Sequence, residues 1–350
     1  MKNIVVTGGC GFIGSNFIFD QLNNYNSNII NIDSLTYSSN KQSDDLFKKT
    51  SRYSFIEGDI VDYKLILSVF KKFKPDLIIN FAAETHVDRS IEEPDEFLKT
   101  NLLGTLNLLK IALSYFQENN SFRFIQISTD EVFGSLSPND KAFTESHPYR
   151  PNSPYSASKA GADHLVRSFN KTYKLPTIIT NCSNNYGPFQ FPEKLIPLMI
   201  ANSLDEKQLP VYGDGKNIRD WLHVKDHCNA LGLIINSGKF GETYNIGSSN
   251  EIKNIDIIKN ICGYLDHKRP RKNKKSYKDL ITFVEDRPGH DLRYSIDSSK
   301  IINELNWKSE IPFKTGLIET VNWYLENEDW WRNIQKMHYN QERLGLNHNF

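Results

Sequence analysis

The sequence predicts an α/β fold in which helices cover both faces of a doubly wound parallel sheet. Three observations carry this prediction. Short, nearly uninterrupted apolar runs recur through the first half of the chain, as expected for strands buried on both faces. Longer segments with helical spacing of apolar residues separate these runs. The first run, residues 2–7, enters a glycine-rich turn at residues 8–14, which is typical of the first βα unit of a Rossmann-type fold.

Length, composition and charge indicate a soluble globular protein. The 350 residues suffice for one large domain or two of ordinary size. The 42 Lys and Arg residues balance the 42 Asp and Glu residues, which argues against nucleic acid or an anionic membrane as a partner. We interpret the basic segment 267–278 as a solvated loop. No apolar run reaches the roughly 18–20 residues that a membrane span needs.

The cysteines predict neither a metal site nor a disulfide framework. Cys10, Cys182, Cys228 and Cys262 lie far apart and show no metal-ligand spacing. Isolated cysteines fit the reducing cytoplasm. The N-terminal residues enter a strand at once, which leaves no room for a signal peptide. We therefore expect a cytoplasmic protein without a metal ion.

The glycine-rich turn predicts a dinucleotide site. Gly8 and Gly11 allow the backbone to approach a pyrophosphate, and Gly14 allows the following helix to pack closely on the strand. The free N–H groups at the start of that helix favour phosphate. A second strand, residues 29–32, ends at Asp33, about 20 residues past the last glycine. A carboxylate there binds the ribose 2′-OH and repels a 2′-phosphate, so NAD is predicted rather than NADP.

Two further strands, residues 53–57 and 76–80, are expected to end at the same edge of the sheet. Residues just past the carboxyl ends of such strands line the ligand crevice. Those expected to contact the cofactor are Asp59, Ile60, Ala82 and Ala83. His86 follows in the same segment, and its place favours contact with a sugar or phosphate over an ordinary loop histidine.

A helix at residues 101–116 and a fifth strand at 123–128 bring Asp130 and Glu131 to the crevice. Adjacent carboxylates at a strand end are either turn residues facing water or an acid and base pair. In the second case one carboxyl is held protonated and the other stays ionised. The crevice position favours the second interpretation.

Tyr155 and Lys159 stand four residues apart at the start of the next predicted helix, residues 154–160 onward. Residues at this spacing project from one helix face, so the ammonium lies within one turn of the phenol. A free tyrosine has a pKa near 10, and a nearby positive charge lowers it. The pair is therefore predicted either to act as a general base on an alcohol or to be an ordinary solvated pair on a helix face, and the spacing alone does not decide between the two.

The glycine pattern, a strand-end Thr129 and the Tyr155-x-x-x-Lys159 pair together resemble the extended short-chain dehydrogenase/reductase superfamily. Six segments narrow the resemblance to the family of dTDP-glucose 4,6-dehydratases. They are residues 81–90 (FAAETHVDRS), 128–134 (STDEVFG), 153–160 (SPYSASKA), 180–195 (TNCSNNYGPFQFPEKL), 209–223 (LPVYGDGKNIRDWLH) and 286–294 (DRPGHDLRY). The pair Asp130–Glu131 is the most specific feature, because sugar epimerases of the superfamily lack it.

The resemblance implies a lyase that removes water from dTDP-glucose through an internal hydride transfer on NAD. Tyr155, aided by Lys159 and Thr129, removes the 4-OH proton while C4 is oxidised. Glu131 then abstracts the C5 proton and Asp130 protonates the departing 6-OH, before C6 is reduced. The product, dTDP-4-keto-6-deoxyglucose, feeds deoxysugar synthesis such as that of dTDP-rhamnose. A homodimer is also implied, with the helix carrying Tyr155 and helix 101–116 packed across a two-fold axis.

The resemblance also assigns binding residues. It adds Phe12 and Ile13 to the NAD contacts, alongside Tyr155 and Lys159. The residues assigned to the nucleotide sugar are Thr85, His86, Thr129, Asn184, Asn185, Glu193, Lys194, Leu195, Pro210, Tyr212, Arg219, Asn254, Arg287 and His290. Tyr212 is placed to stack on thymine, and the arginines suit a diphosphate because a guanidinium binds two oxygens at once.

We expect two lobes and a tail. Residues 1–181, with about 221–249, form the NAD-binding domain of Rossmann type. Residues 182–220 and 250–335 form a smaller α/β lobe that binds the nucleotide sugar, and residues 336–350 form a tail.

Three other functions stay open: a nucleotide-sugar 4-epimerase, a UDP-sugar 4,6-dehydratase and a catalytically idle NAD-binding scaffold. The acidic pair argues against the epimerase. Four reactive side chains at one crevice argue against the scaffold. The preference for thymidine over uridine rests on the resemblance alone.

Overall fold

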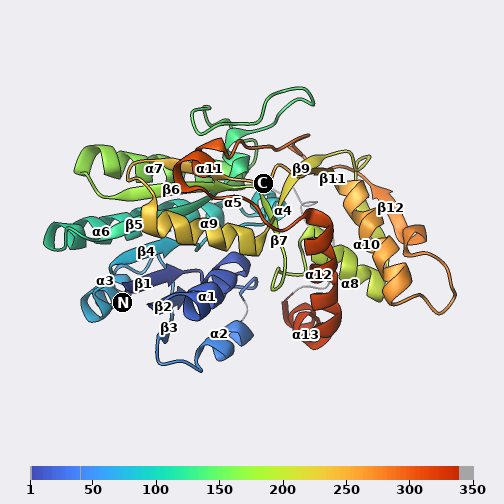
Figure 1. Ribbon diagram of the computed structural model, residues 1–350, viewed down its shortest axis with the longest axis horizontal. Helices are drawn as coiled ribbons and strands as arrows, with labels where there is room; N and C mark the ends of the chain where they lie inside the picture. The colour runs from blue at the N-terminus through green and yellow to red at the C-terminus, as the bar shows by residue number, and fades with distance from the viewer. Residues whose placement is uncertain (1, 40, 339–350) are drawn as a thin grey trace.

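A seven-stranded parallel sheet forms the centre of the computed structural model, which describes residues 2–39 and 41–338 (Figure 1). In spatial order its strands are β10 (Thr243–Ile246), β6 (Thr177–Cys182), β5 (Arg123–Thr129), β4 (Leu77–Asn80), β1 (Lys2–Thr7), β2 (Ser27–Asp33) and β3 (Tyr53–Glu57). Every neighbouring pair is parallel. The predicted doubly wound α/β fold is therefore confirmed. Its strand order reverses between β1 and β4, the point at which such sheets bind ligands.

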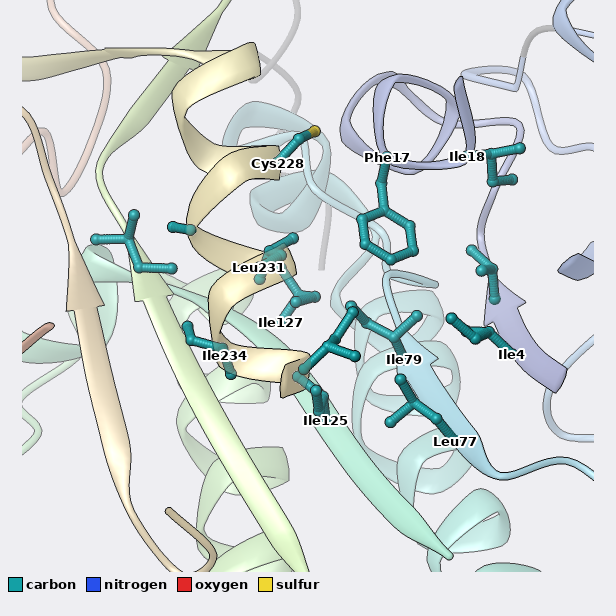
Figure 2. Packing of buried hydrophobic residues seen from close by; sticks show 14 of the residues in the cluster. Ile4, Phe17, Ile18, Leu77, Ile79, Ile125, Ile127, Cys228, Leu231 and Ile234 are labelled. Atoms are coloured by element: carbon teal, nitrogen blue, oxygen red, sulfur yellow. The ribbon is translucent and has the colours of Figure 1, made fainter. Parts of the chain in front are cut away.

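Helices cover both faces of this sheet. One face carries α1 (Phe12–Asn24) and α9 (Val224–Ser237), which pack side by side. Figure 2 shows Phe17 of α1 and Leu231 of α9 over the apolar side chains of the central strands. The other face carries α3 (Tyr63–Phe73), α6 (Thr105–Glu118) and α7 (Pro154–Tyr173).

Successive side chains of each strand enter opposite layers of the core. Ile4 and Val6 belong to the cluster beneath α1 and α9, whereas Val5 between them belongs to the cluster beneath α3, α6 and α7. This alternation follows from the two-residue period of a strand. Both faces of the sheet are thus dry, and full burial of each such side chain contributes about 1.5–3 kcal/mol.

The second half of the chain supplies a smaller group of elements, which lies at the right of Figure 1. It contains a three-stranded sheet in the order β11 (Glu251–Lys253), β9 (Ile218–His223), β7 (Asn184–Tyr186) and a parallel pair of β12 (Ile281–Val284) with β8 (Leu209–Tyr212). Helices α8 (Leu195–Leu204), α10 (Asn254–Lys268), α12 (Phe313–Glu326) and α13 (Glu328–His338) pack around them. Aromatic side chains such as Trp221, Tyr324 and Trp331 fill this second core. The division into an NAD lobe and a sugar lobe stays a prediction.

Shorter elements complete the described chain. They are α2 (Lys41–Phe47), α4 (Val87–Glu92), α5 (Pro94–Phe97), the π-helical segment η1 (Leu98–Gly104), the 3₁₀ turns η2 (Asp130–Phe133) and η3 (Tyr277–Leu280), and α11 (Ser299–Leu305).

Several strands begin or end one or two residues from their predicted bounds, and two helices differ more. The first four residues of the helix predicted at 101–116 belong to the π-helical segment η1, and the α-helix itself, α6, spans Thr105–Glu118. The first three residues of the predicted tail 336–350 belong to helix α13. Residues 339–350 lie outside the described residues.

Between residues 2 and 338, leaving out residue 40, no helix has the length and apolar character needed to cross a membrane. The same residues contain no group of three His, Cys, Asp or Glu side chains that would hold a metal ion.

Candidate active site

A cavity of about 500 Å³ lies at the carboxyl edge of the sheet, where β1, β2, β4, β5 and β6 end. Every residue that the sequence assigns to the cofactor lines it: Gly8, Gly11, Phe12, Ile13, Gly14, Asp33, Asp59, Ile60, Ala82, Ala83, Tyr155 and Lys159. Thr129, Asp130 and Glu131 line the same cavity. The fold thus brings the predicted cofactor contacts and the predicted reactive side chains together.

The glycine turn forms one wall of this cavity. Gly8 has φ +69°, in the left-handed region, and a Cβ there would lie 2.6 Å from the backbone N of Ala82. A Cβ on Gly14 would lie 2.4 Å from the carbonyl oxygen of Gly8. Neither position accepts a larger residue without backbone movement, so β1, β4 and α1 converge tightly at the turn.

Asp33 closes the turn from the end of β2. Its Oδ2 accepts a hydrogen bond from the Cys10 N–H at 2.8 Å, and its Oδ1 accepts from Leu35 N and Ser39 Oγ, each at 2.8 Å. Burial raises the pKa of the Asp33 carboxyl, and these three donors oppose that rise. A carboxylate has about four acceptor sites, so lone pairs remain for a ribose hydroxyl.

Tyr155 and Lys159 enter the cavity from the first turns of α7. A capping box of Ser153 and Ser156 fixes the start of that helix. Lys159 Nζ donates to the Ile127 carbonyl oxygen at 2.7 Å, which ties the ammonium to β5.

The predicted lowering of the Tyr155 pKa is wrong for the structure as it stands. Burial, followed by the negative charge of Glu131, raises the pKa of the phenol well above its ordinary value, although a hydrogen bond with Thr129 lowers it. Spacing indicated that Lys159 would be near, but it gave no measure of how strongly burial disfavours a phenolate. The phenolate therefore needs a further positive charge in the cavity.

Asp130 and Glu131 lie in the 3₁₀ turn that follows β5. The Thr129 hydroxyl caps this turn, accepting from Glu131 N at 3.3 Å. The same hydroxyl donates to Asp130 Oδ1 at 3.4 Å, while the buried Asp130 Oδ2 has no hydrogen-bond partner. A buried carboxylate oxygen without a donor favours the protonated acid.

The surroundings of the two carboxyl groups shift their pKa values to different extents. Burial, followed by the charges of Glu131 and Asp220, raises the pKa of Asp130 well above its ordinary value. Burial also raises the pKa of Glu131, but Arg287, Arg219 and then Lys194 oppose that rise. Glu131 consequently ionises before Asp130, which is the arrangement expected of a base beside an acid.

Asp163 is a functional candidate that the sequence reasoning missed. It lies one further turn along the helix face that carries Tyr155 and Lys159, and it is fully buried. Its Oδ2 accepts from Ser128 Oγ at 2.6 Å and from Tyr149 OH at 3.1 Å. Burial lowers the pKa of Lys159, and the Asp163 charge is the largest influence that raises it again. The spacing Tyr-x-x-x-Lys-x-x-x-Asp was the signal that would have found it.

The residues assigned to the nucleotide sugar divide into two groups. The group that lines the cavity beside Glu131 is Thr85, Thr129, Asn184, Asn185, Glu193 and Lys194. The group outside the cavity lining is His86, Leu195, Pro210, Tyr212, Arg219, Asn254, Arg287 and His290. A single cavity therefore does not gather all the predicted sugar contacts.

Several residues of the second group still meet one another. Asp88, at the start of α4, accepts from Arg287 Nη1 at 3.1 Å and from Tyr212 OH at 3.0 Å. The Tyr212 and His290 rings are edge to face, with centroids 6.1 Å apart. Arg219 donates to the carbonyl oxygens of Ile218 and Asp291, at 2.8 and 3.0 Å.

The remaining residues outside the cavity lining lie within or at the ends of helices and strands of the second half of the chain, apart from His86, which precedes α4. Pro210 lies in β8, Leu195 begins α8, and Asn254 begins α10 with a buried Oδ1 that has no hydrogen-bond partner. His86 caps α4, and burial holds the pKa of its imidazole well below the ordinary value. His86 is therefore neutral at physiological pH.

Comparison with known proteins places these features in a family. The family model described as GDP-mannose 4,6 dehydratase matches residues 5–320. The chain is 52% identical to dTDP-glucose 4,6-dehydratase of Neisseria meningitidis serogroup B over 352 aligned positions, which cover 99% of each protein. The chain belongs to the dTDP-glucose 4,6-dehydratase family.

Solved structures of the dTDP-glucose 4,6-dehydratase family agree with the fold. The enzyme from Bacillus anthracis, solved in complex with NAD, is 45% identical with a TM-score of 0.85 and is matched over 95% of this chain and 100% of its own. The enzyme from Streptomyces venezuelae, solved with NAD and TDP bound, is 42% identical with a TM-score of 0.88 and is matched over 95% and 99%.

The residues of this family member fit NAD. The Gly8 cradle that a Cβ would fill, the Asp33 carboxylate at the end of β2 and the small Ala82 leave backbone and acceptor groups where a dinucleotide needs them. A carboxylate at this position, without an arginine among the cavity-lining residues, favours a free 2′-OH over a 2′-phosphate.

Substituting Gly8 tests the dinucleotide cradle. Gly8→Ala is expected to lose NAD binding, because its Cβ meets Ala82 backbone and its φ strains any side chain, at a cost of about 1–3 kcal/mol. Calorimetric titration with NAD measures the loss. Gly263→Ala is the matched control: nothing lies within 4 Å of the added Cβ, and a helical alanine adds about 0.5–1 kcal/mol of stability. Undiminished NAD affinity in Gly8→Ala would contradict the assignment.

The buried acid predicts a pH-dependent gain in stability on substitution. Because the folded-state pKa of Asp130 lies above its unfolded value, the native protein loses stability as pH rises through that interval. Asp130→Asn removes this loss, so its melting temperature should exceed that of the parent at about pH 8, with a gap that closes towards about pH 4. The exposed Asp95→Asn serves as control, and a pH-independent gap would refute the protonated acid.

Proposed function

We propose that this chain is a dTDP-glucose 4,6-dehydratase, which converts dTDP-glucose to dTDP-4-keto-6-deoxyglucose and water. One observation carries the proposal beyond family membership: the carboxyl groups of buried Asp130 and half-buried Glu131 lie beside Tyr155 in one cavity, and their surroundings shift their pKa values to different extents. An epimerase needs no such pair, because it eliminates nothing from the sugar. Dehydration needs an acid and a base at adjacent carbons.

The cavity residues divide the work of the reaction. Bound NAD supplies a hydride acceptor for C4 of the sugar and a donor for C6, and it is regenerated in each turnover. Tyr155 takes the 4-OH proton, with Thr129 hydrogen-bonded to the phenol. Lys159, which lines the same cavity, keeps the assisting role that the resemblance implies. The 4-keto group acidifies C5, and Glu131 removes that proton. Asp130 gives its proton to the 6-OH, so water departs as the C5–C6 double bond forms. When C6 is reduced, a proton returns from Glu131 to C5, which completes the 4-keto-6-deoxy product.

The binding residues keep the roles that the family resemblance implies. The glycine turn, Asp33 and the other cofactor residues that line the cavity hold NAD. Asn184, Glu193 and Lys194, which line the cavity, are assigned to the sugar, and Arg219 with Arg287, which lie outside its lining, are assigned to the diphosphate. The influence of both arginines on the Glu131 pKa supports this placement, because it puts their charge near the base.

We also propose the homodimer that the resemblance implies, across α6 and α7. Leu98 and Leu103 of the π-helical segment beside α7 are 45% and 54% exposed, which supports an apolar contact there. The four cysteines are free and buried, which supports a reducing cytoplasm. The product is proposed to enter deoxysugar synthesis such as that of dTDP-rhamnose, and the NAD and sugar lobes keep the boundaries given above.

Product mass tests the function. With dTDP-glucose, the parent protein is expected to form a product lighter by one water, with no net reduction of NAD. An epimer of unchanged mass would establish the 4-epimerase instead. Turnover of UDP-glucose in place of dTDP-glucose would overturn the base assignment and keep the dehydration. No turnover of either sugar, in protein that binds NAD, would favour the idle scaffold.

Two variants separate the proton transfers. Tyr155→Phe is expected to block the first step, so that stopped-flow absorbance shows no reduced cofactor in a single turnover. Asp130→Asn is expected to allow that reduction but to slow water loss about 10²–10⁴-fold, the usual contribution of a general acid. Equal loss of both steps in Asp130→Asn would refute this division of roles.

A further inference from the structure

A short segment after β2 runs along the rim of the cavity. Ser34, Thr36, Ser38 and Ser39 all line the cavity, whereas Tyr37 between them does not. Leu35 turns the chain with φ 53°, in the left-handed region. The Asp33 carboxylate holds both ends of the segment, through the Leu35 N–H and the Ser39 hydroxyl. We call residues 34–39 the rim segment.

The Tyr37 side chain connects the rim segment to other parts of the chain through packing, cation–π and hydrogen-bond contacts. Its ring packs against the second core, edge to face with Phe191 at a centroid distance of 5.7 Å. The Arg89 guanidinium lies 3.8 Å from the centroid of the Tyr37 ring. The Tyr37 hydroxyl donates to Glu193 Oε1 at 3.4 Å, and Arg89 Nε lies 3.5 Å from Glu193 Oε2. Tyr37, Arg89 and Glu193 thus form a closed triangle.

The protonation states and burial of these three side chains suit a stable contact between the rim segment and the second half of the chain. Burial, followed by the charge of Glu193, raises the pKa of the Tyr37 phenol, so it stays a neutral donor at every physiological pH. The Glu193 side chain is fully buried, and Arg89 supplies its countercharge. A cation over an aromatic face and a hydrogen bond to a carboxylate are each stronger when shielded from water.

The place of the triangle gives it a functional consequence. It joins three segments that lie far apart in sequence: the rim segment, helix α4 and the loop before α8. The rim segment follows the strand whose terminal Asp33 is assigned to the ribose, so it borders the cofactor end of the cavity. A cofactor that is regenerated in each turnover has to remain bound while sugars enter and leave.

We propose that Tyr37 is a positioning residue that pins the rim segment across the cofactor end of the cavity and slows the release of NAD. The proposal rests on the proposed function, because it requires NAD in this cavity. It assigns Arg89 and Glu193 a shared part in cofactor retention, which adds to the sugar contact expected of Glu193.

NAD exchange tests the proposal without any sugar. Protein loaded with radiolabelled NAD is chased with excess unlabelled NAD, and the release rate is followed by rapid filtration. Tyr37→Ala is expected to release NAD about tenfold faster or more, because it loses the aromatic pair, the cation–π contact and the hydrogen bond together. Tyr37→Phe loses only the hydrogen bond and should fall between Tyr37→Ala and the parent.

The controls separate retention from folding and from the proposed function. Tyr63→Ala removes a 45% exposed tyrosine that does not line the cavity, and it should release NAD at the parental rate. After dilution into NAD-free buffer, Tyr37→Ala should lose dehydration activity over time and recover it when NAD is added. Parental release rates in both Tyr37 variants would overturn the proposal. A parent protein that binds no NAD would contradict the proposed function instead.

Discussion

The burial of ionisable groups at one edge of the sheet is the constraint on which the site depends. Asp130, Lys159 and Asp163 are each less than a tenth exposed, and Glu131 lies beside them. Moving a charge into such surroundings is costly unless an opposite charge or a hydrogen bond compensates it. Each of these groups therefore takes its protonation state from specific neighbours. The neighbours that do this come from distant parts of the sequence.

This constraint explains why the chemistry needs both halves of the chain. The parallel sheet brings Asp130 and Glu131 to the cavity, where burial raises the pKa of both carboxyl groups. The cations that favour ionised Glu131 are Arg219 on β9, Arg287 after β12 and Lys194 before α8. Asp130 instead faces the carboxylates of Glu131 and Asp220, and each of these influences its pKa more than Arg219 does. The two adjacent carboxyl groups thus suit an acid and a base, because the charged residues from the second half of the chain are distributed unequally around them.

The sequence predicted those features that local pattern determines. The strands at 2–7 and 53–57 were located to the residue, because short runs rich in apolar residues between polar segments are typical of strands. The joint placement of Gly8, Asp33 and Asp130 at one edge followed from parallel topology alone. By contrast, the sign of the Tyr155 pKa shift and the counterion role of Asp163 depend on burial, which spacing does not reveal. The role of Tyr37 could not be predicted either, because its partners Arg89 and Glu193 lie 52 and 156 positions away in the sequence.

Charge conservation within the cavity links these observations to the reaction. An ionised Glu131 raises the pKa of Tyr155, so two negative charges there oppose each other. In the proposed mechanism, taking the 4-OH proton neutralises the phenolate and removes that conflict before elimination begins. In the same mechanism Glu131 gains a proton during elimination while Asp130 loses one, so the carboxyl pair carries the same total charge before and after water departs. A site too dry to tolerate a new charge can therefore still expel water, because the charge only moves between neighbouring residues.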